Sequence, residues 1–92
     1  MEILLIEDNP ADIYLLQESF APIPEVQALE VADSLAAAAK FLEARRPDCV
    51  LLDLSLPDSF GLDTFHAVQA MAPDLPVIIL SGNADQTQAL DA

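Results

Sequence analysis

Short apolar runs alternate along the chain with longer segments of helical periodicity. Residues 1–6 (MEILLI) form a continuous apolar run, which is typical of a strand buried on both faces. Residues 48–52 (DCVLL) and residues 75–80 (LPVIIL) have the same character, and residues 25–31 alternate as a weaker strand. The pattern therefore predicts four strands.

Segments with the periodicity of amphipathic helices separate these predicted strands. Apolar side chains recur at helical spacing in three groups, which are Ile13, Leu16 and Phe20, then Leu35, Ala38, Ala39 and Leu42, then Leu62, Phe65, Val68 and Ala72. Asn9 is expected to cap the first helix, and Asp33 or Ser34 the second. The second helix should close with Arg45 and Arg46, so that it holds all three basic residues, and residues 85–92 should begin a further helix.

Strands that are apolar throughout and alternate with helices indicate an α/β fold with a parallel sheet covered on both faces. Right-handed crossovers then restrict the topology to a doubly wound arrangement. We expect residues 1–92 to form one domain, because a chain of this length allows no more.

The chain is very acidic. The chain has 16 Asp and Glu against 3 Lys and Arg, a net charge of −13, and 53% hydrophobic residues, enough for a real core. The charge argues against binding to nucleic acid or to an anionic membrane, and fits a cation site or a basic partner. No apolar run approaches the roughly 20 residues of a membrane span, and the single Cys49 excludes an internal disulfide. We therefore expect a soluble, cytosolic domain.

Acidic residues follow two of the predicted strands. Glu7 and Asp8 end the first, Asp53 ends the third, and Ser81 follows the fourth. The carboxyl ends of parallel strands share one edge of the sheet, so the carboxylates should converge and favour a hard cation such as Mg²⁺. A carboxylate there can attack phosphorus and form an aspartyl phosphate, which the Ser81 hydroxyl could hydrogen-bond. Taken singly, Asp8 could be a helix cap and the Ser81 segment an ordinary turn; the combination favours a site.

Three segments carry a family resemblance. They are IEDNPAD at residues 6–12, VLLDLSLPDSFGLD at residues 50–63 and PVIILSG at residues 76–82. In order and spacing they resemble the receiver domain of two-component response regulators. The resemblance implies a flavodoxin-like fold with strand order 2-1-3-4 for the four strands present.

The resemblance also implies a role for each matching residue. Asp53 matches the phospho-acceptor and Ser81 the switch hydroxyl. Glu7 and Asp8 match the acid pair that holds Mg²⁺, with Asp8, Asp53 and the backbone carbonyl of Ser55 as direct ligands. The implied function is a phosphorylation-dependent signalling switch. It receives its phosphoryl group from a histidine kinase or phosphotransfer protein, and it catalyses only its own phosphorylation and dephosphorylation.

The chain departs from the family at its end. Receiver domains have a fifth strand carrying a lysine, followed by a fifth helix, and this sequence stops before both. Lys40 cannot replace that lysine, because it belongs to the second predicted helix. We expect an incomplete receiver, with the fourth strand open to self-association.

Two other functions stay open. A degenerate receiver could act only as a protein-interaction module, since the lysine is missing. A Mg²⁺-dependent phosphoryl-transfer enzyme is a weaker alternative, because Asp53-Leu54-Ser55 lacks the second Asp of the Asp-x-Asp motif. His66 is expected to face solvent rather than to relay phosphoryl groups, and Asp58 and Asp74 to be solvated loop or cap residues.

Overall fold

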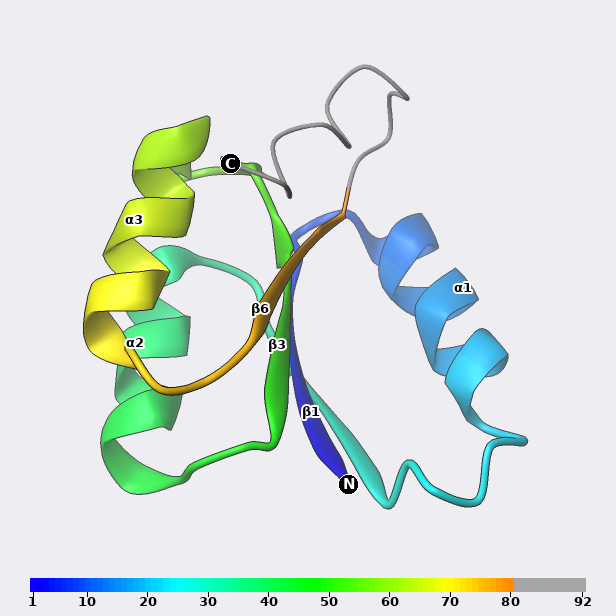
Figure 1. Cartoon of the computed structure of the whole chain (residues 1–92). Helices are drawn as coiled ribbons and strands as arrows, with labels where there is room; N and C mark the ends of the chain where they lie inside the picture. The colour runs from blue at the N-terminus through cyan, green and yellow to red at the C-terminus, as the bar shows by residue number, and fades with distance from the viewer. Residues whose placement is uncertain (81–92) are drawn as a thin grey trace.

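The computed structural model describes residues 1–80, which form a parallel sheet with helices on both faces (Figure 1). The predictions for Ser81 and for residues 85–92 lie outside this range. The elements in chain order are β1 (Glu2–Ile6), α1 (Pro10–Phe20), β2 (Ala28–Ala32), α2 (Leu35–Ala44), β3 (Cys49–Asp53), β4 (Ser55–Leu56), β5 (Ser59–Phe60), α3 (Leu62–Met71) and β6 (Val77–Leu80). The main sheet has the order β2-β1-β3-β6 with every pair parallel, so the predicted doubly wound fold is confirmed.

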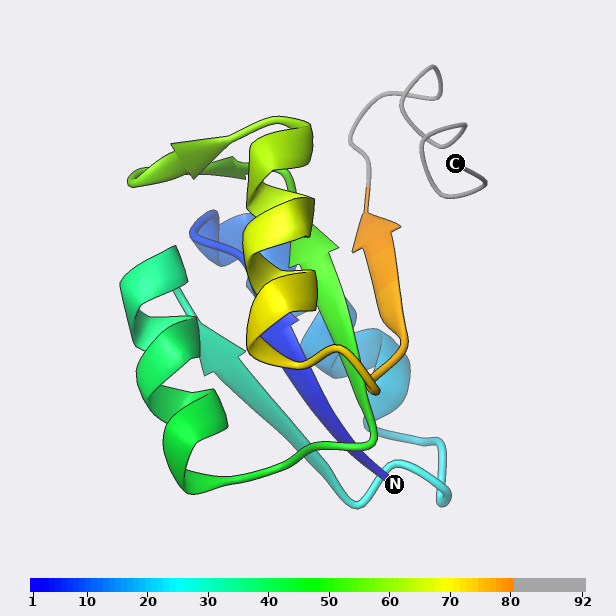
Figure 2. The same ribbon diagram turned by 60° about the vertical axis from the view of Figure 1, so that its left-hand side comes forward.

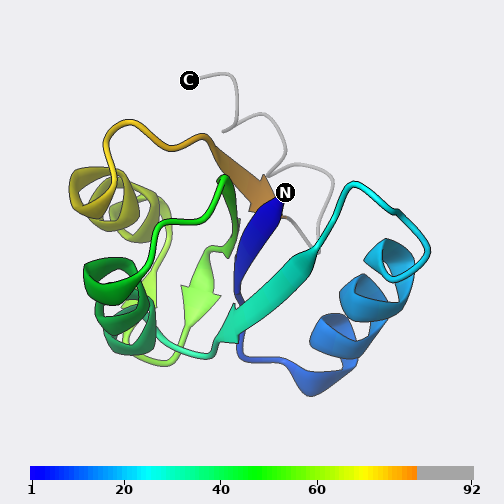
Figure 3. The ribbon, with the colours of Figure 1, turned by 90° about the horizontal axis from the view of Figure 1, so that it is seen from below.

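Each face of the sheet has its own apolar core. Leu4 and Ile6 of β1 belong, with Val50 and Leu52 of β3, to a cluster that packs against α2 and α3. The intervening side chains Ile3, Leu5 and Leu51 face the other way and pack against α1. Figure 3 shows α1 alone on one side of the sheet and the other two helices on the opposite side. This alternation is why the strands had to be apolar at every position.

The first two helices begin where the sequence predicts. Asn9 caps α1, and its side-chain Oδ1 accepts hydrogen bonds from the amides of Ala11 at 2.9 Å and Asp12 at 3.3 Å. Ser34, rather than Asp33, caps α2 through a 3.0 Å bond from the amide of Ala37 to Oγ. Both caps are local interactions, so a short sequence window is enough to predict them.

Two predicted boundaries were wrong. Strand β2 starts at Ala28 and not at residue 25, because residues 23–27 form a turn in which the Val26 amide donates to the Ile23 carbonyl. Helix α2 ends at Ala44, so Arg45 and Arg46 lie beyond it. Arg45 already has extended backbone as the chain approaches Pro47.

The two arginines tie the end of α2 to neighbouring strands and loops. Arg45 lies 3.3 Å from Glu2 and 3.8 Å from Glu30, and Arg46 forms an ion pair with Asp74. These pairs are solvent-exposed, so they contribute little to stability. They do place both guanidinium groups at the amino-terminal edge of the sheet.

Strands β2 and β6 are the outer strands of the sheet among residues 1–80. Figure 2 shows β6 at one side, with its outward edge away from β3. Self-association through this edge stays a prediction. No helix in the described range has the length and apolar character needed to cross a membrane.

Candidate functional site

The acidic residues at the carboxyl ends of β1 and β3 lie side by side. Ile6 pairs with Leu52 in the parallel register, so the chain positions that come next, Glu7 just beyond β1 and Asp53 at the end of β3, are neighbours at one edge of the sheet. Glu7, Asp8 and Asp53 each place a carboxylate oxygen within 4.8 Å of the others. The predicted convergence of three carboxylates at this edge is therefore present in the structure.

The three carboxylates differ in burial. Glu7 is only 5% exposed, Asp53 is half-buried, and Asp8 is exposed to solvent. The Glu7 side chain is fixed by the start of the following loop, because its Oε2 accepts hydrogen bonds from the amides of Asp8 at 3.1 Å and Asn9 at 3.3 Å. Its own amide donates to the Ala32 carbonyl at 3.0 Å, which holds it against β2. The cluster thus combines a buried, hydrogen-bonded carboxylate at Glu7 with a solvent-exposed one at Asp8.

Burial raises the pKa of the Glu7 carboxyl from 4.5 to about 7. A hydrogen bond with the Asp53 side chain and the negative charge of Asp53 add to this effect, while the Asn9 amide opposes it. Near neutral pH the Glu7 carboxyl is therefore only partly ionised, because burial beside another acidic group favours its neutral form. A bound divalent cation would instead favour the ionised form.

The donor set fits Mg²⁺. Carboxylate oxygens are the ligands a hard divalent cation prefers, and an exposed side leaves room for the waters that Mg²⁺ keeps. The two arginines cannot neutralise the cluster, because they pair with Glu2, Glu30 and Asp74 at the opposite edge of the sheet.

A small hairpin begins directly beyond Asp53. Within residues 54–61, β4 and β5 pair antiparallel, with Ser55 opposite Phe60 and Leu56 opposite Ser59. Three apolar residues among these eight, Leu54, Leu56 and Phe60, are too weak a signal to predict a strand pair from the sequence. Gly61 closes the hairpin with a φ of +73°, a region that favours glycine, and its amide donates to the Leu54 carbonyl at 2.8 Å. Ser55 lies exposed at the start of this hairpin, two positions after Asp53.

The model of the response regulator receiver domain family matches residues 3–92. The chain belongs to this family. It is therefore a receiver domain of two-component signal transduction, and receiver domains are typically signalling modules rather than enzymes.

The receiver domain has relatives of known name and structure. It is 45% identical over 51 residues to the regulatory protein LuxO of Vibrio vulnificus, an overlap of 55% of this chain and only 11% of that protein. It is 31% identical to the phosphorylated cyanobacterial phytochrome response regulator RcpA, with a TM-score of 0.78, covering 97% of this chain and 74% of the other. It is 27% identical to the receiver domain of the sensor histidine kinase PA1611 from Pseudomonas aeruginosa, whose structure has a magnesium ion in its active-site cleft. That match has a TM-score of 0.78 and covers 96% and 72% of the two chains.

The prediction that Asp58 is a solvated loop or cap residue is confirmed, and the helix that it caps is distant from it in the sequence. Asp58, at the tip of the hairpin, accepts hydrogen bonds from the amides of Leu35 at 2.8 Å and Ala36 at 3.0 Å, with one carboxylate oxygen for each. These two bonds hold the pKa of Asp58 below its usual value. No local pattern could reveal this contact, because its partners lie 22 and 23 positions earlier in the chain.

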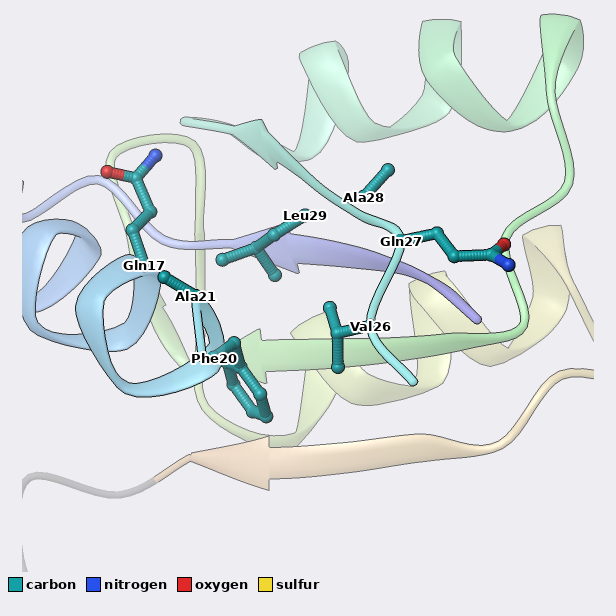
Figure 4. A pocket seen from close by; sticks show the side chains of 7 residues that line it. All are labelled: Gln17, Phe20, Ala21, Val26, Gln27, Ala28 and Leu29. Atoms are coloured by element: carbon teal, nitrogen blue, oxygen red, sulfur yellow. The ribbon is translucent and has the colours of Figure 1, made fainter. Parts of the chain in front are cut away.

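Other candidate positions lie away from the carboxylates. His66 is exposed on α3, as predicted, and Ser81 lies outside the described residues. A pocket of about 250 Å³ opens between the end of α1, at Gln17, Phe20 and Ala21, and residues 26–29 (Figure 4). These elements meet at the amino-terminal edge of the sheet, and the lining holds no acidic residue or histidine, so this pocket is not the chemical site.

Proposed function

We propose that the receiver domain is a phosphorylation-dependent switch and that Asp53 is its phospho-acceptor. The observation that carries the proposal is the meeting of Glu7, Asp8 and Asp53 at adjacent strand ends in a chain of this family. Asp53 is half-buried at the centre of the sheet edge, where a donor can reach its carboxylate. The phosphorylated state of the related RcpA is consistent with this assignment.

The transfer is a nucleophilic displacement at phosphorus. An Asp53 oxygen forms the new O–P bond while the bond between phosphorus and a histidine nitrogen of the donor breaks, and that nitrogen regains a proton. The donor would be a histidine kinase or a phosphotransfer protein. A cytoplasmic location is part of the same proposal, since receiver domains as a family usually act there.

Mg²⁺ is the cofactor in this proposal. Asp8, Asp53 and the backbone carbonyl of Ser55 would hold the ion, with Glu7 beside them. When bound, the ion neutralises charge that develops on the phosphoryl oxygens. The magnesium-bound PA1611 receiver domain and the oxygen-rich cluster both support this assignment. Ser81, one position beyond β6, would donate its hydroxyl to the phosphoryl group and so report the phosphorylated state.

Intact mass spectrometry tests the acceptor. The chain is incubated with Mg²⁺ and a small phosphodonor such as acetyl phosphate, and we expect one added phosphoryl group that is lost in Asp53→Asn. Asp63→Asn is the matched control, because Asp63 is an exposed carboxylate on the first turn of α3 and should leave labelling intact. An adduct that persists in Asp53→Asn, or a wild-type chain that never labels, would contradict the proposal. Turnover of an external phosphate ester would instead indicate an enzyme.

A further inference from the structure

The hairpin at residues 55–60 is attached to the rest of the domain through both of its strands and through its turn. On the β4 side, Leu54 and Leu56 are each only 8% exposed and belong to the core under α2 and α3. The Ser59 hydroxyl lies 2.7 Å from the hydroxyl of Thr64, a fully buried residue of α3. Core packing thus holds β4, and one side-chain hydrogen bond to α3 holds β5 at Ser59, beside the turn.

Asp58 attaches the turn of the hairpin, residues 57–58, to α2. Its two carboxylate oxygens accept from the amides of Leu35 and Ala36, which are free donors in the first turn of α2. The neighbouring residues Pro57 and Phe60 are exposed, Phe60 at 75%. Among the hydrogen bonds of the described residues, the two made by Asp58 are the ones that join the hairpin to α2.

The same helix end has a second, independent cap. The Ser34 hydroxyl accepts from the Ala37 amide, and Ser34 belongs to the segment that precedes α2 rather than to the hairpin. Asp58 and Ser34 therefore both satisfy amides of one helix turn, but only Asp58 connects that turn to the residues beside Asp53. This difference separates a capping role from a positioning role.

We propose that Asp58 is a positioning residue that fixes the β4–β5 hairpin, and with it the Ser55 backbone, beside the carboxylate cluster. The inference rests on the proposed function, in which the Ser55 carbonyl is a Mg²⁺ ligand. Without the two bonds from α2, the turn loses its attachment to that helix, and only the packing of Leu54 and Leu56 and the bond between Ser59 and Thr64 still hold the hairpin. The carbonyl of Ser55 then spends less time aimed at the ion, and the affinity for Mg²⁺ falls.

The test compares Asp58→Ala with Ser34→Ala in the full chain. Mg²⁺ affinity is measured by calorimetric titration, and thermal unfolding is measured on the same samples in EDTA. Both variants should unfold at lower temperature, because each removes acceptors from the same helix turn. Mg²⁺ binding should weaken about tenfold in Asp58→Ala, the lower end of the range for residues that orient metal ligands, and less than twofold in Ser34→Ala. Asp58→Asn keeps one acceptor and should lie between wild type and Asp58→Ala. It also keeps the comparison open if Asp58→Ala does not fold.

The possible outcomes distinguish failure of the positioning role of Asp58 from failure of the proposed function. The positioning role would be overturned if Asp58→Ala and Ser34→Ala lost Mg²⁺ affinity equally, or if a folded Asp58 variant kept the wild-type affinity. In either case, Mg²⁺ binding by the wild-type chain would still support the proposed function. A wild-type chain without saturable Mg²⁺ binding would overturn both. A loss confined to the Asp58 variants would support the inference, because an effect on helix stability alone would appear in Ser34→Ala as well.

Discussion

The buried carboxyl group of Glu7 should weaken the metal-free receiver domain as pH rises, and Glu7→Gln should remove that weakness. Glu7 is 5% exposed and lies against Asp53, so its charged form is disfavoured. Glutamine has nearly the same shape. Its side-chain oxygen can accept from the Asp8 and Asn9 amides as Oε2 of Glu7 does, and its nitrogen can donate to Asp53.

The sign and size of the effect follow from the raised pKa. Between 4.5 and about 7 the folded chain keeps the Glu7 proton, whereas the unfolded chain loses it. The free energy of unfolding therefore falls as pH rises through this interval and levels off above it. At about 1.36 kcal/mol for each pH unit, the loss reaches at most about 3 kcal/mol, and Glu7→Gln does not incur it.

Urea unfolding of both chains in EDTA, at several pH values between about 5 and about 8, measures this loss. Acidic groups away from the carboxylate cluster contribute equally in the two chains, so the difference in unfolding free energy reports Glu7 together with its coupling to Asp53. We expect Glu7→Gln to gain steadily on the wild type and the gain to level off near pH 7. A difference that stays constant with pH, with equal urea dependence in the two chains, would refute the idea that burial raises this pKa.

Two further predictions concern stability and use the same unfolding assay at fixed pH. Leu52→Ala should cost about 2–5 kcal/mol, because Leu52 is fully buried between the sheet and its helices. Leu15→Ala, at a side chain 61% exposed on α1, is its control and should stay within about 0.5 kcal/mol. Asn9→Ala should cost about 1 kcal/mol by removing the acceptor for two amides of α1, and Asn9→Ser should recover most of it.

The fold could be predicted because its signals are local and strong. Apolar runs at β1, β3 and β6 leave little alternative to strands buried on both faces, and Asn9 and Ser34 cap helices within three residues of themselves. The start of β2 could not be predicted as well. It depends on a turn at residues 23–27, whose Gln27 amide bonds to the Met1 carbonyl far back in the chain.

Some features of the candidate site could likewise be predicted from the sequence, and others could not. The meeting of Glu7 with Asp53 follows from strand adjacency, which topology rules supply once the sheet is parallel. The raised pKa of Glu7 needed the actual burial, and the bonds of Asp58 needed the position of α2 relative to the hairpin. Contacts that follow from strand order can be predicted from the sequence, whereas a contact between a hairpin and a helix that are distant in the sequence cannot.

The bonds between Asp58 and α2 also set an order of events during synthesis and folding. When α2 first leaves the ribosome, only Ser34 is available to satisfy an amide of its first turn, because Asp58 is still 22 positions from Ala36 along the chain. The Leu35 and Ala36 amides can gain these acceptors only after residue 58 has been made, and so after the whole of β3. The first turn of α2 is therefore completed by a residue that is synthesised later than Asp53.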